Sequence, residues 1–249
     1  MALIHSLEKN GNFLFKYRGQ IPVVLFLCSI PVVLSMDYTF LFSNSNTEWV
    51  LLLCCVLISL LGQVIRAIAI GTSNKHTSGR NTKEQVAEAL NTKGIYSTVR
   101  HPLYLGNYFM WLGIVVYTFS IWFSIAFSLF FWLYYERIMF AEERFLERKF
   151  GESYLSWSMK VPPFIPSFKN YIKTDIPFSM KTILRREYSG ITATVIGFLF
   201  VAVLRNWNLF GTFIFETKHM IILVLALLIS LVLRSLKHYT KFLHEEDRS

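Results

Sequence analysis

The sequence has 249 residues, of which 53% are hydrophobic and only 16% are charged, and its formal net charge is +9. Average soluble domains are about 45–50% apolar and about 25% charged, so this composition indicates a membrane protein. The positive charge gathers between apolar runs, as membrane orientation requires, and we therefore expect no nucleic-acid partner. The three cysteines lie inside apolar runs without metal-ligand spacing, so they predict neither disulfides nor a metal site.

A helix that crosses the hydrocarbon core of a membrane needs about 20 apolar residues. The sequence offers six candidate spans: 21–42, 49–70, two within 103–135, 190–204 and 220–233. The stretch 103–135 is too long for one span, and a break near 118–120 would make it a tight helical hairpin. The predicted fold is therefore an all-α, polytopic transmembrane helical bundle.

Basic residues precede the first span, follow the second and fourth spans, and close the chain, whereas the alternate loops carry few. This asymmetry predicts that both termini and the polar segments 71–102 and 136–188 are cytoplasmic. The hairpin should bring these two segments together into a cytoplasmic cofactor pocket. We expect a multi-pass protein of a bacterial plasma membrane or a eukaryotic endoplasmic reticulum. Its parts would be two N-terminal helices (1–70), a core (71–170) and a C-terminal two-helix extension (171–249).

Two motifs carry the candidate chemistry. The first is RHPLYLG at 100–106, where Arg100 and His101 stand at the mouth of a membrane helix and Pro102 suits its first turn. The second starts with Glu142 and Glu143, just beyond an apolar run, where acidic side chains are costly if buried. Taken alone, the first is compatible with an interfacial anchor and the second with a solvated helix face.

In this order, with EE-x-x-L-x-x-x-FG-x-x-Y and VP-x-x-x-P after the hairpin, the motifs resemble the isoprenylcysteine carboxyl methyltransferase and phospholipid methyltransferase superfamily of membrane enzymes. The resemblance covers about residues 71–166. It implies that S-adenosylmethionine binds between the two motifs and that residues 88–91 contribute a backbone strip. The implied cofactor-binding residues are Tyr96, Arg100, His101, Pro102, Leu103, Tyr104 and Glu142.

Family members that methylate carboxylates use an arginine shortly before the acidic pair, which implies a catalytic role for Arg137. Arg137 and Glu142 are five residues apart, however, and so about 140° apart around an α-helix. Glu143, on an adjacent face, would orient a loop or act as a base. The acceptor remains open among a lipid phosphate, a phospholipid amine and a prenylcysteine carboxylate, each of them a membrane lipid or lipid-linked substrate.

A membrane NADPH-dependent reductase of related fold is the alternative function, and a non-enzymatic membrane partner is a third. The combination of RHPLYLG with the glutamate pair favours methyl transfer. The loop 71–94 is predicted to be helical in its second half, and its cationic cluster (Lys75, His76, Arg80 and Lys83) would face lipid headgroups or cover a phosphate. In the extension, which shows no in-plane acidic residue, Arg205 is expected to snorkel to the outer interface. The extension would line a lipid entrance or mediate a dimer, and the oligomeric state stays open.

Overall fold

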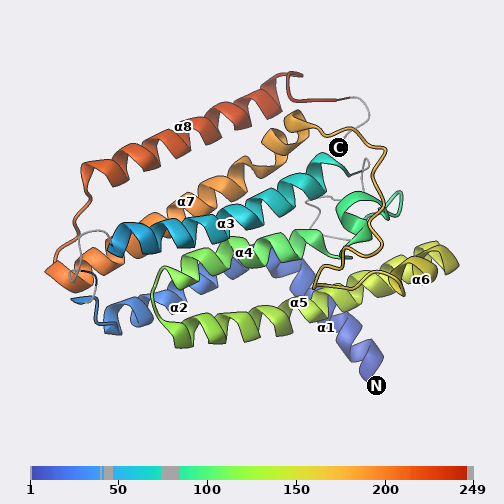
Figure 1. Ribbon diagram of the computed structural model, residues 1–249, viewed down its shortest axis with the longest axis horizontal. Helices are drawn as coiled ribbons and strands as arrows, with labels where there is room; N and C mark the ends of the chain where they lie inside the picture. The colour runs from blue at the N-terminus through green and yellow to red at the C-terminus, as the bar shows by residue number, and fades with distance from the viewer. Residues whose placement is uncertain (1, 40, 42–46, 74–84, 246–249) are drawn as a thin grey trace.

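The computed structural model describes residues 2–39, 41, 47–73 and 85–245. Over these residues the chain forms helices and no β-strand, which confirms the all-α prediction. The long helices run side by side, with α8 at one edge of the bundle (Figure 1). The elements are α1 (Leu3–Tyr17), η1 (Arg18–Gln20), α2 (Ile21–Ser35), α3 (Thr47–Gly71), η3 (Gly94–Ser97), α4 (Pro102–Val116), α5 (Ile121–Phe150), α6 (Glu152–Ser158), α7 (Met180–Phe210) and α8 (Thr217–Tyr239).

Within the described part of the chain, four helical stretches are long and apolar enough to cross a membrane: Leu3–Ser35, Thr47–Gly71, Met180–Phe210 and Thr217–Tyr239. The first differs from the predicted span 21–42, because α2 ends at Ser35 and Met36 is extended. The missing length comes from α1, whose Gly11 packs so closely on α5 that an added Cβ would lie 2.1 Å from the Arg137 carbonyl oxygen. Because α1 contains polar residues, the hydropathy of the sequence does not indicate that it packs on α5. Six spans remain a prediction.

The predicted hairpin is present. The apolar helix α4 ends at Val116, and α5 begins at Ile121, so the break falls where the sequence places it. Phe119 turns the chain with a φ of 58°, and the Ser120 side chain accepts a hydrogen bond from the Phe123 N–H at 3.3 Å. This N-cap satisfies one of the free donors at the start of α5. Helix α5 then continues past its apolar part, so its charged half projects beyond the hairpin.

Among the described helices, α3 and α4 make the most extensive contact. A Cβ on Gly62 would lie 2.4 Å from the Gly106 carbonyl oxygen, and a Cβ on Gly106 would lie 2.5 Å from Cγ of Arg66. Small residues let helix backbones approach closely where lipid offers no hydrophobic drive for association. The hydroxyl of Ser59 also donates to the Met110 carbonyl at 2.7 Å. This contact brings Arg66 against the first turns of α4.

The C-terminal extension is built into the bundle, because α7 packs against α2, α3 and α4. Helix α8 packs mainly on α7 and contains no buried residue. The expectation that Arg205 snorkels is wrong. Its side chain is 3% exposed, and it pairs with Glu48 and donates to the Tyr117 hydroxyl at 2.8 Å. A charge buried in the bundle needs such partners, which the linear sequence places far apart.

The predicted helix in the second half of the 71–94 loop is also wrong, as far as the structure describes it. Residues 85–93 form bends and irregular backbone, and only the 3₁₀ turn η3 follows. The Gln85 side chain donates to Asn12 Oδ1 of α1 at 3.0 Å, and Lys93 pairs with Asp175, so both ends of this segment have tertiary contacts that can override local helix propensity. The cationic cluster Lys75, His76, Arg80 and Lys83 lies outside the described residues.

Candidate active site

A cavity of about 260 Å³ opens at one end of the bundle. It lies where the last turns of α3, the first turns of α4 and α7 and the charged half of α5 meet, with α6 and the segment 85–87 completing the wall. All seven predicted cofactor-binding residues line it: Tyr96, Arg100, His101, Pro102, Leu103, Tyr104 and Glu142. The structure therefore brings the two motifs to one cavity. The roles of these residues stay predictions.

A strap formed by residues 161–174 fixes the first motif through its backbone. The N–H groups of Arg100 and His101 donate to the carbonyl oxygens of Pro162 and Pro163 at 2.9 and 3.2 Å. Proline has no N–H but keeps its carbonyl acceptor, so the Pro-Pro pair suits this role. Gly94, with a φ of +62°, turns the chain into η3 and donates to Ile172 at 2.8 Å. These bonds explain why VPPFIP accompanies the RHP motif.

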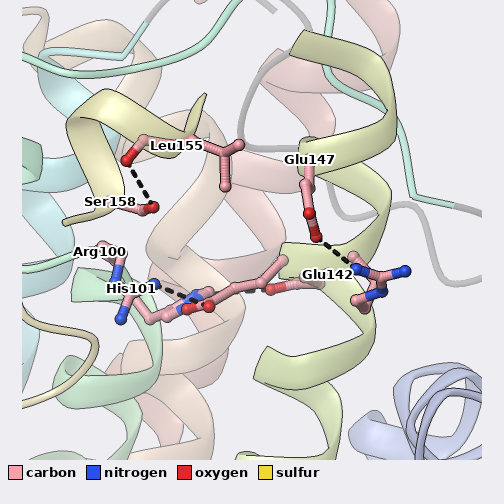
Figure 2. Close-up of polar contacts among 8 residues, drawn as sticks. Arg100, His101, Glu142, Glu147, Leu155 and Ser158 are labelled. Atoms are coloured by element: carbon pink, nitrogen blue, oxygen red, sulfur yellow. Dashed lines mark hydrogen bonds and ion pairs between the residues drawn. The ribbon is translucent and has the colours of Figure 1, made fainter. Parts of the chain in front are cut away.

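Arg100 and His101 converge on Glu143 of α5. Arg100 donates through Nη1 to Oε2 of Glu143 at 2.7 Å, and His101 Nε2 lies 2.9 Å from Oε1. Figure 2 shows Arg100 and His101 facing α5 beside Glu142. Pro102 begins α4, and the His101 side chain makes no capping bond, so it is available to α5. The contacts of Arg100 and His101 with Glu143 thus join the two motifs beside the cavity.

Glu142 accepts a hydrogen bond from the Tyr104 hydroxyl at 2.7 Å, and its other oxygen lies 3.6 Å from His101 Nδ1. Burial raises the pKa of Glu142 above its ordinary value. Burial acts on Glu143 in the same direction, but the hydrogen bond from His101 and the charges of His101 and Arg100 outweigh it and lower the pKa of Glu143. Two adjacent carboxylates with opposite pKa shifts are typical of functional sites. Glu142 is the one that faces the cavity.

Aromatic side chains form much of the remaining wall. The carbonyl of Tyr96 accepts a hydrogen bond from Trp157 Nε1 at 3.2 Å, which fastens α6 over the cavity. Burial raises the pKa of Tyr96 to about 12, so its phenol stays neutral at physiological pH. The ring of Tyr104 stacks on His101, with centroids 5.8 Å apart. The wall thus offers flat apolar faces next to charged groups.

Several lining residues were not predicted from the sequence. Arg66 makes a bidentate pair with Glu187, with both N–O distances 2.7 Å, and donates to Asn107 Oδ1 at 2.6 Å. The Glu187 side chain is only 2% exposed, so the extension does contain an acidic residue inside the bundle. Arg66 stands as a charge within an otherwise apolar run, and that signal could have identified it.

The lining of the cavity also includes Phe15, Arg18, Arg186 and the segment 85–87, which all lie outside the two motifs. The strip expected at 88–91 is thus displaced by three residues, since Gln85, Val86 and Ala87 line the cavity. The two predicted catalytic residues are not among the lining residues. Arg137 lies where α1 crosses α5, and Glu143 stands behind Arg100 and His101.

Comparisons with known proteins agree with this geometry. The family model for phospholipid methyltransferases matches residues 49–153. A protein-S-isoprenylcysteine O-methyltransferase from Schizosaccharomyces pombe is 35% identical over 132 residues, which cover 51% of this chain and 52% of that protein. The chain therefore spans about half the length of this relative.

Two further relatives share more of their length with the chain. A probable protein-S-isoprenylcysteine O-methyltransferase from Oryza sativa subsp. indica is 25% identical over 67% of the chain and 92% of its own length. The Saccharomyces cerevisiae protein-S-isoprenylcysteine O-methyltransferase is 28% identical over 66% and 68%. No solved structure matches the chain. The reductase alternative gains no support from these matches. These matches support the isoprenylcysteine carboxyl methyltransferase and phospholipid methyltransferase superfamily as the group of proteins that the chain resembles.

Proposed function

We propose that the protein is an S-adenosylmethionine-dependent methyltransferase that esterifies a carboxylate on a lipid-borne acceptor at the cytoplasmic face of its membrane. The observation that carries this proposal is the convergence of both family motifs on one cavity. Glu142 with Tyr104 and Glu143 with Arg100 and His101 join segments about 40 residues apart on either side of the hairpin.

The lining residues fit S-adenosylmethionine. This cofactor carries an ammonium, a carboxylate and hydroxyl groups, together with a flat adenine ring. Glu142 would accept hydrogen bonds from the ammonium or the hydroxyls, and Arg100 would pair the carboxylate while Glu143 holds its other side. Tyr96 and Trp157 provide faces for the ring. When bound, the cofactor supplies an electrophilic methyl carbon on a sulfonium.

The charges of the cavity favour an anionic acceptor. Among the described residues, four arginines line it, Arg18, Arg66, Arg100 and Arg186, against two carboxylates, Glu142 and Glu187. A carboxylate acceptor needs a cation to position it and no base to deprotonate it, whereas an amine needs a base. Glu143 is engaged by Arg100 and His101, which suits a positioning role. The isoprenylcysteine O-methyltransferase names of the relatives agree with a prenylcysteine carboxylate.

The chain's own contribution is alignment and exclusion of water. Helix α6 and the 85–87 segment line the cavity, and the strap holds the backbone of Arg100 and His101 in place beside it. Holding two reactants in line can lower a barrier by about 7–11 kcal/mol relative to free encounter. The basic segments beside the cavity support a cytoplasmic position for it under the positive-inside rule.

Cofactor binding tests the proposal first. Detergent-purified protein should bind S-adenosylhomocysteine and not NADPH in a calorimetric titration. Replacing Glu142 by Gln removes a partly buried charged partner, for which we take the low end of the usual cost, about 2 kcal/mol, or roughly 30-fold in Kd. Glu147→Gln is the matched control, since Glu147 lies on the same helix and pairs only with Arg144. Equal Kd values for the two variants would refute the site.

The identity of the methylated group tests the second part of the proposal, that the acceptor is a carboxylate. Protein supplied with methyl-labelled cofactor should label N-acetyl-S-farnesylcysteine, and mild alkali should release the label because a methyl ester has formed. Transfer to phosphatidylethanolamine instead would give an alkali-stable N-methyl product. That result would replace the carboxylate acceptor by an amine.

A further inference from the structure

The strap exposes large apolar side chains at one end of the bundle. In Figure 1 the chain between α6 and α7 crosses the end at which α4 and α7 begin. Phe168 is 75% exposed and Tyr171 is 56% exposed. The Tyr171 N–H donates to the Phe168 carbonyl oxygen at 3.3 Å, so residues 168–171 form a turn with an aromatic ring at each end. Exposed apolar side chains that gather in one place mark an interaction surface.

The length of α7 places this turn at the level of lipid headgroups. Helix α7 is a candidate membrane span of 31 residues, which rise about 46 Å. The hydrocarbon core of a bilayer is only about 30 Å thick, and the bilayer with its headgroup regions is about 40–45 Å thick. The first turns of α7 therefore lie among headgroups. Tyr171 precedes Met180, the first residue of α7, by nine positions, so the turn lies beside the same layer.

The charge of this segment favours anionic headgroups. Residues 153–174 contain three lysines and no acidic residue. Two of the lysines, Lys169 and Lys173, are exposed, and the next acidic residue along the chain, Asp175, pairs with Lys93. Basic segments beside a membrane span attract anionic lipids, and aromatic side chains favour the same interfacial layer. An acidic protein would also match the lysines, but the position of the turn beside a span favours the leaflet.

Both ends of the turn are hydrogen-bonded to η3 and the residue after it. The Ser167 N–H donates to the Thr98 carbonyl oxygen at 2.9 Å, and the Ile172 N–H donates to Ser97 Oγ at 2.9 Å. Tyr96 of η3 lines the active-site cavity. A contact that immobilises the turn therefore also holds η3 in the conformation that forms this part of the cavity wall.

We infer that the turn 168–171, with Lys169 and Lys173, binds anionic headgroups of the adjoining leaflet and thereby holds η3 and Tyr96 in place. The lipid contact depends only on the membrane spans, whereas its effect on the cofactor rests on the proposed function. The lipid acts here as a ligand of the strap and is not methylated. Because the attraction is electrostatic at an exposed surface, it should weaken with ionic strength.

Amide hydrogen exchange tests the lipid contact. The full chain in nanodiscs of phosphatidylcholine and phosphatidylglycerol in equal parts should exchange more slowly at 94–98 and 167–172 than in phosphatidylcholine alone. Lys169→Gln should reduce this added protection by about fivefold, the usual share of one lysine at an anionic surface. Lys149→Gln is the matched control, since Lys149 is exposed on the last turn of α5. Equal exchange of the unaltered chain in both nanodiscs, or an equal loss in the two variants, would overturn the inference.

The affinity for S-adenosylhomocysteine tests the link to the cavity. This ligand carries one ammonium and one carboxylate, so an anionic leaflet does not concentrate it at the surface. Its Kd should be lower in the mixed nanodiscs than in phosphatidylcholine, and Lys169→Gln should reduce the difference while Lys149→Gln keeps it. Lipid-dependent protection without any binding of S-adenosylhomocysteine would support the lipid contact and refute the proposed function. Binding with equal Kd in both nanodiscs would overturn the link between the leaflet and the cavity.

Discussion

The Arg66–Glu187 pair offers a direct test of how the extension supports the active site. Glu187→Gln removes the charge that partners a guanidinium whose side chain is only 16% exposed. Breaking a buried ion pair from one side costs about 3–5 kcal/mol, because the remaining charge stays buried. Arg66 borders the cavity and retains Asn107, so we expect the low end, about 3 kcal/mol.

This cost translates into a measurable melting shift. For proteins of 150–250 residues, 1 kcal/mol corresponds to about 2–4 °C, so Glu187→Gln should lower the unfolding midpoint in detergent by roughly 6–12 °C. Adding Arg66→Met should recover part of the loss, because no unpaired charge is then buried. Asp175→Asn is the control, since its ion pair with Lys93 is exposed on both sides. Equal midpoints for Glu187→Gln and Asp175→Asn would refute the reasoning.

Two further predictions concern packing and pH. Gly106→Ala places a Cβ 2.8 Å from the Gly62 carbonyl oxygen and should destabilise the fold by about 1–3 kcal/mol. Gly19→Ala is the control, because a Cβ at Gly19 meets open space. Similar unfolding midpoints for the two variants would show that α3 and α4 are not in close contact. Burial raises the pKa of Glu142, whose charged form would hold the cofactor under the proposed function. The affinity for S-adenosylhomocysteine should therefore begin to fall with acidification above pH 4.5, the ordinary glutamate value. The Glu142→Gln variant should lack this dependence, and a fall confined to lower pH would contradict the assignment.

What the sequence predicts well is local. The hairpin break follows from an apolar run too long for one span, and Ser120 supplies the cap that starts the second helix. Tyr96, residues 100–104 and Glu142 line one cavity because the hairpin folds together the two motifs on either side of it. The break of the hairpin and each motif can be recognised within a few residues of the sequence.

What the sequence does not predict depends on distant partners. The helix α1 is stabilised by a backbone contact between Gly11 and Arg137, 126 positions apart, and its polar residues conceal it. Arg205 and Glu187 appear as isolated charges until their partners Glu48 and Arg66 are known.

The two ion pairs between α3 and α7 have a consequence for kinetics. Arg66 with Glu187 ties the helices at one end, and Glu48 with Arg205 ties them at the other. Separation of these helices would leave the buried Arg66, Glu187 and Arg205 side chains without these partners, whereas α8 has no buried residue among those described. We therefore expect a lipid-borne acceptor that enters between helices to pass α8, and a cysteine crosslink between α7 and α8 should slow turnover while leaving cofactor affinity unchanged.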